Sequence, residues 1–230
     1  MTRPTILFDL DGTLVDTATD LIASLNHAVG QAGMEPVTYD DLTHLVGHGA
    51  RAMIERTFRL RDRPLDDETL AWQLKEFLDF YEGSMPGLSL PYPGVIQAIE
   101  RLGRDGMVFA VCTNKTERLA RTLVDTLGLG HLFAAIAGGD TFPVRKPDPG
   151  HILGTIAMAG GSPQHAVMIG DSRSDILGAR HAGIPSIGVP FGYSDVPVAD
   201  LEPDALIEHF DQLDAALVLR LMSARNAPAR

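Results

Sequence analysis

Four short motifs in this 230-residue sequence carry side chains that do acid–base, nucleophilic or metal-binding chemistry. In chain order they are Asp9-Leu10-Asp11-Gly12-Thr13, Thr113-Asn114, Lys146-Pro147, and Gly170-Asp171 with Asp175. Carboxylates act as nucleophiles, as proton carriers and as ligands of hard cations, and a lysine among them offsets their charge. These motifs can build one reactive site only if the fold brings them together.

The elements around the motifs supply the expected fold. Short apolar runs predict strands at Thr5–Leu10, Met107–Cys112, Ala134–Ala137, Ala166–Ile169 and Ser186–Val189, with a weaker one at Ala205–Ile207. Helical patterns alternate with them, at Lys115–Leu127, Pro149–Ala159 and Ser172–Ala182. This alternation predicts an α/β fold with a doubly wound parallel sheet. Ligands of such sheets bind at the carboxyl ends of the strands, so we expect the four motifs to meet at one edge.

One interval departs from this alternation. Between Thr17 and about Leu88 the sequence shows only helical patterns, at Thr19–Ala32, Tyr39–Leu45, Ala50–Leu60 and Asp66–Tyr81. That is too much helix for a single crossover connection, so we expect an all-helical cap at residues 17–88 inserted into a core of residues 1–16 and 89–230. The junctions, Val15-Asp16 and Met85–Gly94, suit hinges of a moving lid. A fixed helical layer is the alternative.

Each motif also has an ordinary structural explanation. An Asp-x-Asp pair is often a solvated turn, Thr113 can cap the helix that follows it, and Lys146 can be a surface charge. Gly170-Asp171 can be a turn with a helix cap, and Asp175 a solvated helix residue. The order of the motifs and their shared sheet edge favour a site.

In that order, the motifs resemble those of the haloacid dehalogenase superfamily over nearly the whole chain, and the position of the cap resembles the helical-cap subclass. Three further segments are similar to bacterial phosphoglycolate phosphatases: Leu45–Ala50, Gly138–Pro149 and Phe191–Tyr193. The superfamily contains enzymes for carbon–halogen bonds that lack the second Asp of the first motif. Asp11 therefore favours phosphoryl chemistry.

The resemblance implies a magnesium-dependent phosphatase. Mg²⁺ would be held by the carboxylates of Asp9 and Asp171 and by the backbone carbonyl of Asp11, with Asp175 a direct or water-mediated ligand. Asp9 would attack phosphorus to give an aspartyl-phosphate, and Asp11 would protonate the leaving oxygen and later deprotonate the attacking water.

The same resemblance assigns the groups around the phosphate. Thr113 and the Asn114 backbone N–H would bind phosphate oxygens, and Lys146 would balance the charge of the intermediate. Gly12 and Thr13 would lie against the substrate. The substrate is expected to be a small phosphorylated metabolite, with 2-phosphoglycolate favoured.

Substrate choice is expected to come from the cap. The loop at Gly47-His48-Gly49-Ala50 joins two expected cap helices, and His48 or Arg51 could meet a substrate carboxylate near a helix start. The alternative is an ordinary interhelix turn with a solvated histidine.

Other functions fit parts of the pattern. A phosphatase of another sugar, amino-sugar or acid phosphate, or a sugar phosphomutase of the same superfamily, would share the core motifs. From a different class, a phospho-acceptor signalling domain also has acids, a Thr and a Lys at strand ends, but such domains are about half this length and lack a cap.

Composition excludes several classes of partner. With 30 acidic and 19 basic residues the formal net charge is −11, which argues against nucleic acid or an anionic membrane as a partner. The single cysteine, Cys112, lies in an apolar run and predicts a buried thiol. No targeting or membrane-spanning segment is recognised, so we expect a cytoplasmic location. The assembly is expected to be a monomer or homodimer.

Overall fold

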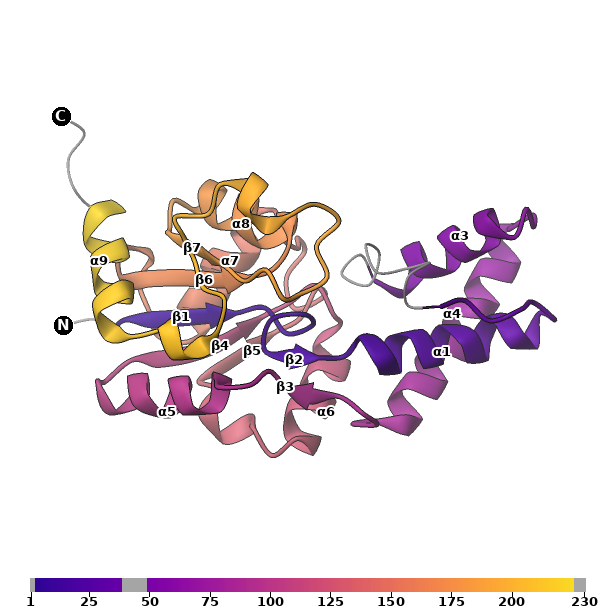
Figure 1. Cartoon of the computed structure of the whole chain (residues 1–230), viewed down its shortest axis with the longest axis horizontal. Coiled ribbons are helices and arrows are strands. Elements are labelled where there is room, and N and C mark those ends of the chain that lie inside the picture. The colour runs from indigo at the N-terminus through magenta and orange to yellow at the C-terminus, as the bar shows by residue number, and fades with distance from the viewer. Residues whose placement is uncertain (1–2, 39–48, 226–230) are drawn as a thin grey trace.

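The structure is a computed structural model that describes residues 3–38 and 49–225. It has an α/β core with a helical cap at one end of the sheet (Figure 1). The strands are β1 (Thr5–Phe8), β2 (Val15–Asp16), β3 (Leu90–Pro91), β4 (Val108–Cys112), β5 (Ala135–Ala137), β6 (Ala166–Gly170), β7 (Ser186–Gly188) and β8 (Ala205–Leu206). The helices are α1 (Ala18–Gln31), α3 (Ala50–Leu60), α4 (Asp67–Ser84), α5 (Val95–Arg104), α6 (Glu117–Thr126), α7 (Pro149–Met158), α8 (Arg173–Ala182) and α9 (Ala215–Arg225).

The central sheet determines where the motifs meet. Its six strands are parallel in the order β5-β4-β1-β6-β7-β8. Strand order therefore reverses at β1, whose Phe8 pairs with Val111 of β4 on one side and Ile169 of β6 on the other. The crevice at such a reversal is the usual ligand site of open α/β sheets. The residues that follow β1, β4 and β6 lie side by side there.

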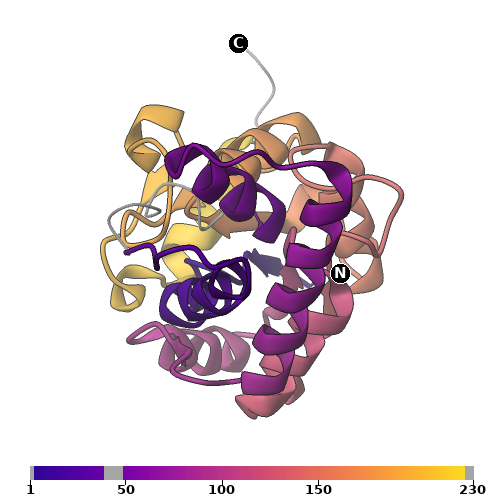
Figure 2. The same ribbon diagram turned by 90° about the vertical axis from the view of Figure 1, so that its right-hand side faces the viewer.

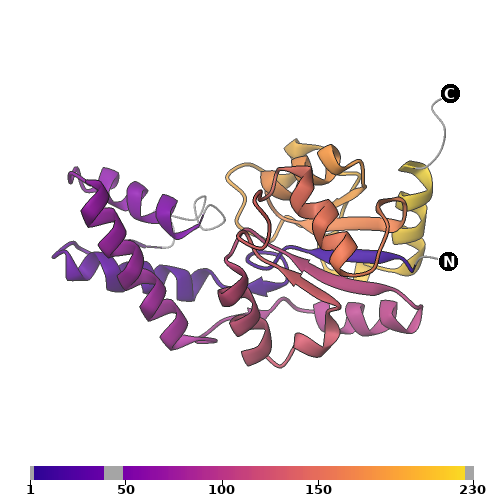
Figure 3. The same ribbon diagram turned by 180° about the vertical axis from the view of Figure 1, so that it is seen from behind.

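Helices cover both faces of this sheet, which confirms the doubly wound α/β architecture. Alternate side chains of β1 point to opposite faces, as a strand requires. Ile6 and Phe8 pack in a core with α5, α6 and α9, while Leu7 packs with residues of α7 and α8. Figure 3 shows α7 lying across the sheet on that second face. Cys112 is buried in the second core, as its apolar run predicted.

The cap has a hydrophobic core of its own. Helices α1, α3 and α4 bury Leu25, Ile54 and Phe77 against one another, and Figure 2 shows these helices in front of the carboxyl end of β1. Helix α3 has the predicted bounds, and α1 and α4 differ from theirs by a few residues. The helix expected at Tyr39–Leu45 lies outside the described residues. We propose residues 17–88 as the limits of the cap.

The two connections to the cap form an antiparallel pair that the sequence did not predict. Strands β2 and β3 are two residues long and pair Val15 with Pro91 and Asp16 with Leu90. Asp20 of α1 reinforces the junction, because its carboxylate accepts the backbone N–H groups of Leu88 and Ser89 and the Ser89 hydroxyl. Pairs this short carry no hydrophobic periodicity, so pattern analysis does not detect them.

Candidate active site

Lys146 joins the first and fourth motifs at the end of the sheet. Its Nζ lies 3.0 Å from Asp9 Oδ1 and 2.6 Å from Asp175 Oδ1, and its side chain is fully buried. The Leu10 N–H also donates to Asp9 Oδ1, at 2.7 Å. Although burial opposes it, the carboxylates of Asp175 and Asp9 hold the pKa of Lys146 above its usual value. Lys146 is therefore a fixed positive charge beside Asp9.

Three carboxylates converge at this point. Ligand oxygens of Asp9, Asp171 and Asp175 all lie within 4.8 Å of one another, and all three residues are buried. Burial, followed by the negative charge of Asp175, raises the pKa of Asp9 to about 7 and that of Asp171 to about 8. One lysine cannot offset three ionised carboxylates at such distances, so a divalent cation fits this donor set.

Asp171 is held rigidly in the cluster. The Thr13 hydroxyl donates to its Oδ1 at 2.9 Å, and the Tyr193 N–H donates to its Oδ2 at 2.7 Å. Gly12, at φ +83°, passes so close that a Cβ there would lie 2.6 Å from Asp171 Oδ2. Thr13 is itself fully buried. In this structure Thr13 contacts the carboxylate that was expected to bind metal.

Both carboxylate oxygens of Asp175 are occupied by protein donors. Oδ1 binds Lys146, and Oδ2 accepts the Ser172 N–H at 3.0 Å and the Ser172 hydroxyl at 2.6 Å. The bond from the Ser172 N–H is one half of the capping box of α8, which is why Asp175 points back to the start of its helix. Asp175 is fully buried, so the alternative of a solvated helix residue is wrong.

The second motif lies beside the same cluster. Thr113 follows β4, is 2% exposed, and accepts the Lys115 N–H at 3.2 Å through its hydroxyl. Helix α6 begins only at Glu117, with Thr116 as its N-cap, so the alternative that Thr113 caps it is wrong. Asn114 Nδ2 donates to the Lys146 carbonyl at 3.0 Å and ties the second motif to the third.

Asp11 has partners that the sequence analysis did not identify. Lys115 Nζ lies 2.9 Å from Asp11 Oδ1 and 3.0 Å from Oδ2, and the Thr17 hydroxyl donates to Oδ1 at 2.7 Å. Lys115 Nζ also lies 4.5 Å from the ring centroid of Tyr81, which comes from α4 of the cap. The sequence signal that could have identified Lys115 as a site residue is its position immediately after Thr113-Asn114. Spacing alone does not distinguish such a lysine from a surface lysine.

The expected substrate-selecting loop is described only in part. Gly47 and His48 lie outside the described residues. Arg51, in the first turn of α3, donates to Glu55 at 2.8 Å, and its side chain is 63% exposed. In this conformation Arg51 is therefore engaged on the cap surface.

Comparison with known proteins identifies the family. The family model described as haloacid dehalogenase-like hydrolase matches residues 6–189. The chain belongs to the haloacid dehalogenase-like hydrolases. A phosphoglycolate phosphatase of Agrobacterium fabrum is 55% identical to it over 226 residues, which are 98% of this chain and 97% of that protein.

More distant relatives of this hydrolase carry the same description. A phosphoglycolate phosphatase of Caulobacter vibrioides is 42% identical over 95% of this chain and 92% of its own length. The crystal structure of a protein described as a predicted phosphoglycolate phosphatase from Haemophilus somnus matches with a TM-score of 0.86 at 28% identity, covering 95% of this chain and 99% of that one. The resemblance found in the motifs is thereby confirmed, and the chain is a phosphoric monoester hydrolase.

In residues 3–38 and 49–225, no helix combines the length and the apolar character needed to cross a bilayer.

Proposed function

We propose that this hydrolase is a Mg²⁺-dependent phosphatase that converts 2-phosphoglycolate to glycolate and phosphate through an aspartyl-phosphate on Asp9. The observation that carries the proposal is the buried cluster in which Lys146 contacts Asp9 and Asp175 beside Asp171. An anionic nucleophile attacks a phosphate dianion only where fixed positive charge offsets the repulsion. The cluster supports that arrangement.

The donor set supports magnesium as the cation. Asp9, Asp171 and the Asp11 backbone carbonyl would hold Mg²⁺, and oxygen ligands of this kind suit a hard ion that retains several waters. Because protein donors already engage both oxygens of Asp175, we favour its water-mediated role. Bound there, Mg²⁺ would withdraw charge from the phosphoryl oxygens.

Two carboxylates divide the chemistry. Asp9 would form a bond to phosphorus as the ester oxygen leaves, and water would then cleave the acyl-phosphate. Asp11 would give a proton to the leaving oxygen and take one from that water. The two side chains are two residues apart at the end of β1, but they have different partners: Asp9 contacts Lys146, whereas Asp11 contacts Lys115 and Thr17. Different surroundings allow different roles for the two carboxylates.

Phosphate binding would involve the second and third motifs. Thr113 and the Asn114 N–H would donate to phosphoryl oxygens, and Lys146 would offset the charge of the phosphorylated Asp9. Gly12 would let the backbone approach the substrate closely. The hydrogen bond from the Asn114 side chain to the Lys146 carbonyl would fix the second and third motifs relative to each other.

The choice of 2-phosphoglycolate rests on the relatives, which carry that activity in their names at up to 55% identity over nearly the full chain. His48 or Arg51 remains our proposal for contact with the substrate carboxylate. If Arg51 makes that contact, it must leave Glu55. A cytoplasmic monomer or homodimer remains the prediction for location and assembly.

A phosphate-release assay over a panel of metabolites tests the proposal. The panel would hold 2-phosphoglycolate, other sugar and amino-sugar phosphates, and an uncharged aryl phosphate, each with Mg²⁺ and with EDTA. We expect the highest kcat/KM for 2-phosphoglycolate and no turnover in EDTA. A higher value for a sugar phosphate would reassign the substrate, isomer formation without phosphate release would indicate a mutase, and a stable acyl-phosphate without turnover would indicate a signalling domain.

Arg51→Ala tests the cap contact separately. We expect a raised KM for 2-phosphoglycolate and an unchanged KM for the aryl phosphate. Equal effects on both substrates would remove Arg51 from carboxylate recognition.

A further inference from the structure

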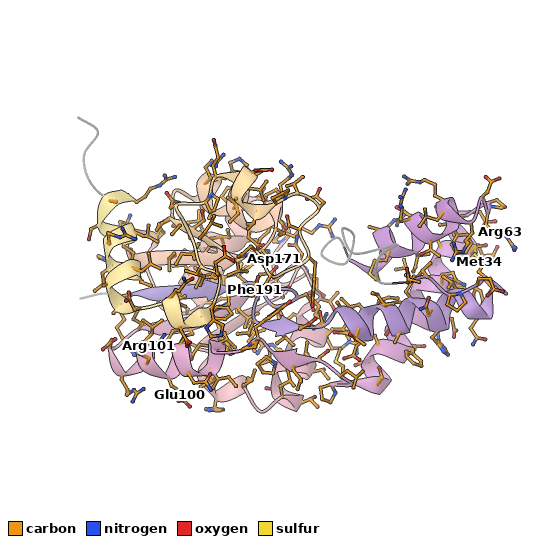
Figure 4. All side chains as sticks on the ribbon, viewed as in Figure 1. Met34, Arg63, Glu100, Arg101, Asp171 and Phe191 are labelled. Atoms are coloured by element: carbon orange, nitrogen blue, oxygen red, sulfur yellow. The ribbon has the colours of Figure 1, made fainter. Side chains whose placement is uncertain are left out.

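Tyr193 connects the carboxylate cluster to the start of the cap. It lies in the loop that follows β7, next to Phe191 and Gly192, and is 3% exposed. Figure 4 shows Asp171 and Phe191 near each other in the half of the core that is closer to the cap. The Tyr193 ring packs in the hydrophobic core of the cap although its backbone belongs to the catalytic core.

The side chain of Tyr193 caps the first helix of the cap. Its hydroxyl accepts the backbone N–H groups of Thr17 at 2.8 Å and Ala18 at 3.0 Å, and donates to Asp16 Oδ1. Thr17 is the N-cap residue of α1, and its own side chain makes no cap hydrogen bond. The first N–H groups of a helix lack partners within the helix and need an outside acceptor. For α1, the Tyr193 hydroxyl from a distant part of the chain is such an acceptor.

The backbone of the same residue holds Asp171. The Tyr193 N–H donates to Asp171 Oδ2 at 2.7 Å. The loop is packed tightly onto this carboxylate, since a Cβ on Gly192 would lie 2.3 Å from Asp171 Cβ and 2.4 Å from the Gly12 carbonyl oxygen. With no spare room there, a displacement of Tyr193 must also displace Asp171 or break the hydrogen bond to it.

We propose that Tyr193 is a positioning residue that links the cap hinge at residues 16–18 to Asp171, so that cap orientation and metal affinity are set together. The inference rests on the proposed metal role of Asp171. Because coupling between two sites is reciprocal, a hinge contact that strengthens metal binding must itself be strengthened by the metal, by the same factor. Both directions can be measured without substrate.

Tyr193→Phe is the direct test. The ring and its packing stay, and only the hydroxyl that contacts Asp16, Thr17 and Ala18 is lost. Thr57→Val is the matched control, because it removes another buried hydroxyl of the cap, which donates to the Met53 carbonyl within α3 at 2.9 Å. Mg²⁺ affinity of the full chain is measured by calorimetry, and amide exchange at Thr17 and Ala18 is measured with and without Mg²⁺.

We expect Mg²⁺ to bind Tyr193→Phe about three- to thirtyfold more weakly than wild type, in line with one or two net hydrogen bonds, and Thr57→Val to bind as wild type does. Mg²⁺ should slow amide exchange at residues 17 and 18 in wild type and have little effect on it in Tyr193→Phe. If the hydroxyl only stabilises the helix start, Tyr193→Phe will exchange these amides faster both with and without Mg²⁺ and will bind Mg²⁺ as wild type does. That result would overturn the proposal.

Asp16→Ala gives a second route should Tyr193→Phe fold poorly. It removes the carboxylate that accepts the Tyr193 hydroxyl, and we expect a smaller loss of Mg²⁺ affinity in the same direction. Unchanged affinity would overturn the link. If wild type does not bind Mg²⁺, the proposed function is wrong. If wild type binds Mg²⁺ and the variants bind it equally well, only the link through Tyr193 is wrong.

Discussion

Lys115 forms a nearly symmetrical ion pair with Asp11, its Nζ lying 2.9 and 3.0 Å from the two carboxylate oxygens. The lysine side chain is 6% exposed and that of Asp11 16%, so this pair is far less screened by water than a surface pair. The Asp11 carboxylate acts as an acceptor toward both Lys115 and Thr17. The group that we propose as the proton donor to the leaving oxygen is thus fixed in place by hydrogen-bond donors.

Lys115→Met should therefore lower kcat roughly ten- to a hundredfold, a part of what a positioned acid–base group contributes. The methionine fills similar space but leaves Asp11 without its ion pair. Lys75→Met is the control, because Lys75 makes an exposed pair with Asp79 on the cap surface. A wild-type kcat in Lys115→Met would show that the ion pair with Lys115 does not contribute to the function of Asp11.

Lys146→Met should cost stability as well as activity. It removes a buried charge from between Asp9 and Asp175 and leaves carboxylates without their partner. Removing one partner of a buried pair costs about 3–5 kcal/mol. Urea unfolding without metal should show a loss of this order at pH 8 and a smaller one at pH 6, where protonation of Asp9 and Asp171 relieves the repulsion. A loss independent of pH would count against charge as the cause.

Magnesium should stabilise the protein more at pH 8 than at pH 6. The pKa of Asp9 is raised to about 7 and that of Asp171 to about 8, mainly by burial. The metal-free folded state therefore holds protons that the unfolded state has released above about pH 4, and its stability falls as pH rises through 7 and 8. Mg²⁺ must displace these protons, so its affinity grows over the same range. The check is the Mg²⁺-induced shift in Tm at the two pH values; a larger shift at pH 6 would contradict the assignment.

His151 should destabilise the fold in mild acid. Its Nδ1 accepts the Lys146 backbone N–H at 3.1 Å, and burial, followed by the charge of Lys146, lowers its pKa to about 4. The unfolded chain takes up a proton near pH 6.5 and the folded chain only near pH 4, so stability is lost as pH falls through that window, by at most about 3 kcal/mol.

His151→Asn isolates this contribution, because an amide oxygen can accept the same N–H without titrating. Urea unfolding between pH 7 and pH 4 should show a shallower loss for the variant than for wild type. Parallel curves would assign acid sensitivity to other groups.

The sheet and the convergence of the motifs could be predicted from the sequence, because three of the four motifs directly follow an apolar run that is typical of a buried strand. Apolar runs marked β1, β4 and β6, and parallel strands present their carboxyl ends at one edge of a sheet. That rule predicted the meeting of Asp9 and Asp171, which lie in one cluster. Most strands are shorter than predicted, as β1 is, which ends at Phe8 and not at Leu10, but β6 extends one residue further than predicted, to Gly170. The chain leaves the sheet after Phe8 because Asp9 and Asp11 turn into the site.

The remaining features depend on contacts between distant residues. Helices α5 and α9 were not identified, although α5 buries Val95, Ile99 and Leu102 on one face. Lys115 and Tyr193 each contact a partner more than 100 residues away in the sequence, Asp11 and Asp16 respectively. Local pattern carries no information on such pairs.

The central claim is that Asp9 becomes phosphorylated, and acid quenching tests it most directly. Wild-type enzyme mixed with radiolabelled substrate and Mg²⁺ and quenched within the first turnover should carry acid-stable, hydroxylamine-labile label on Asp9. Asp9→Asn should carry none and release no phosphate while it unfolds cooperatively, and Asp11→Asn should retain label with slowed turnover. Sustained phosphate release by Asp9→Asn would contradict the account.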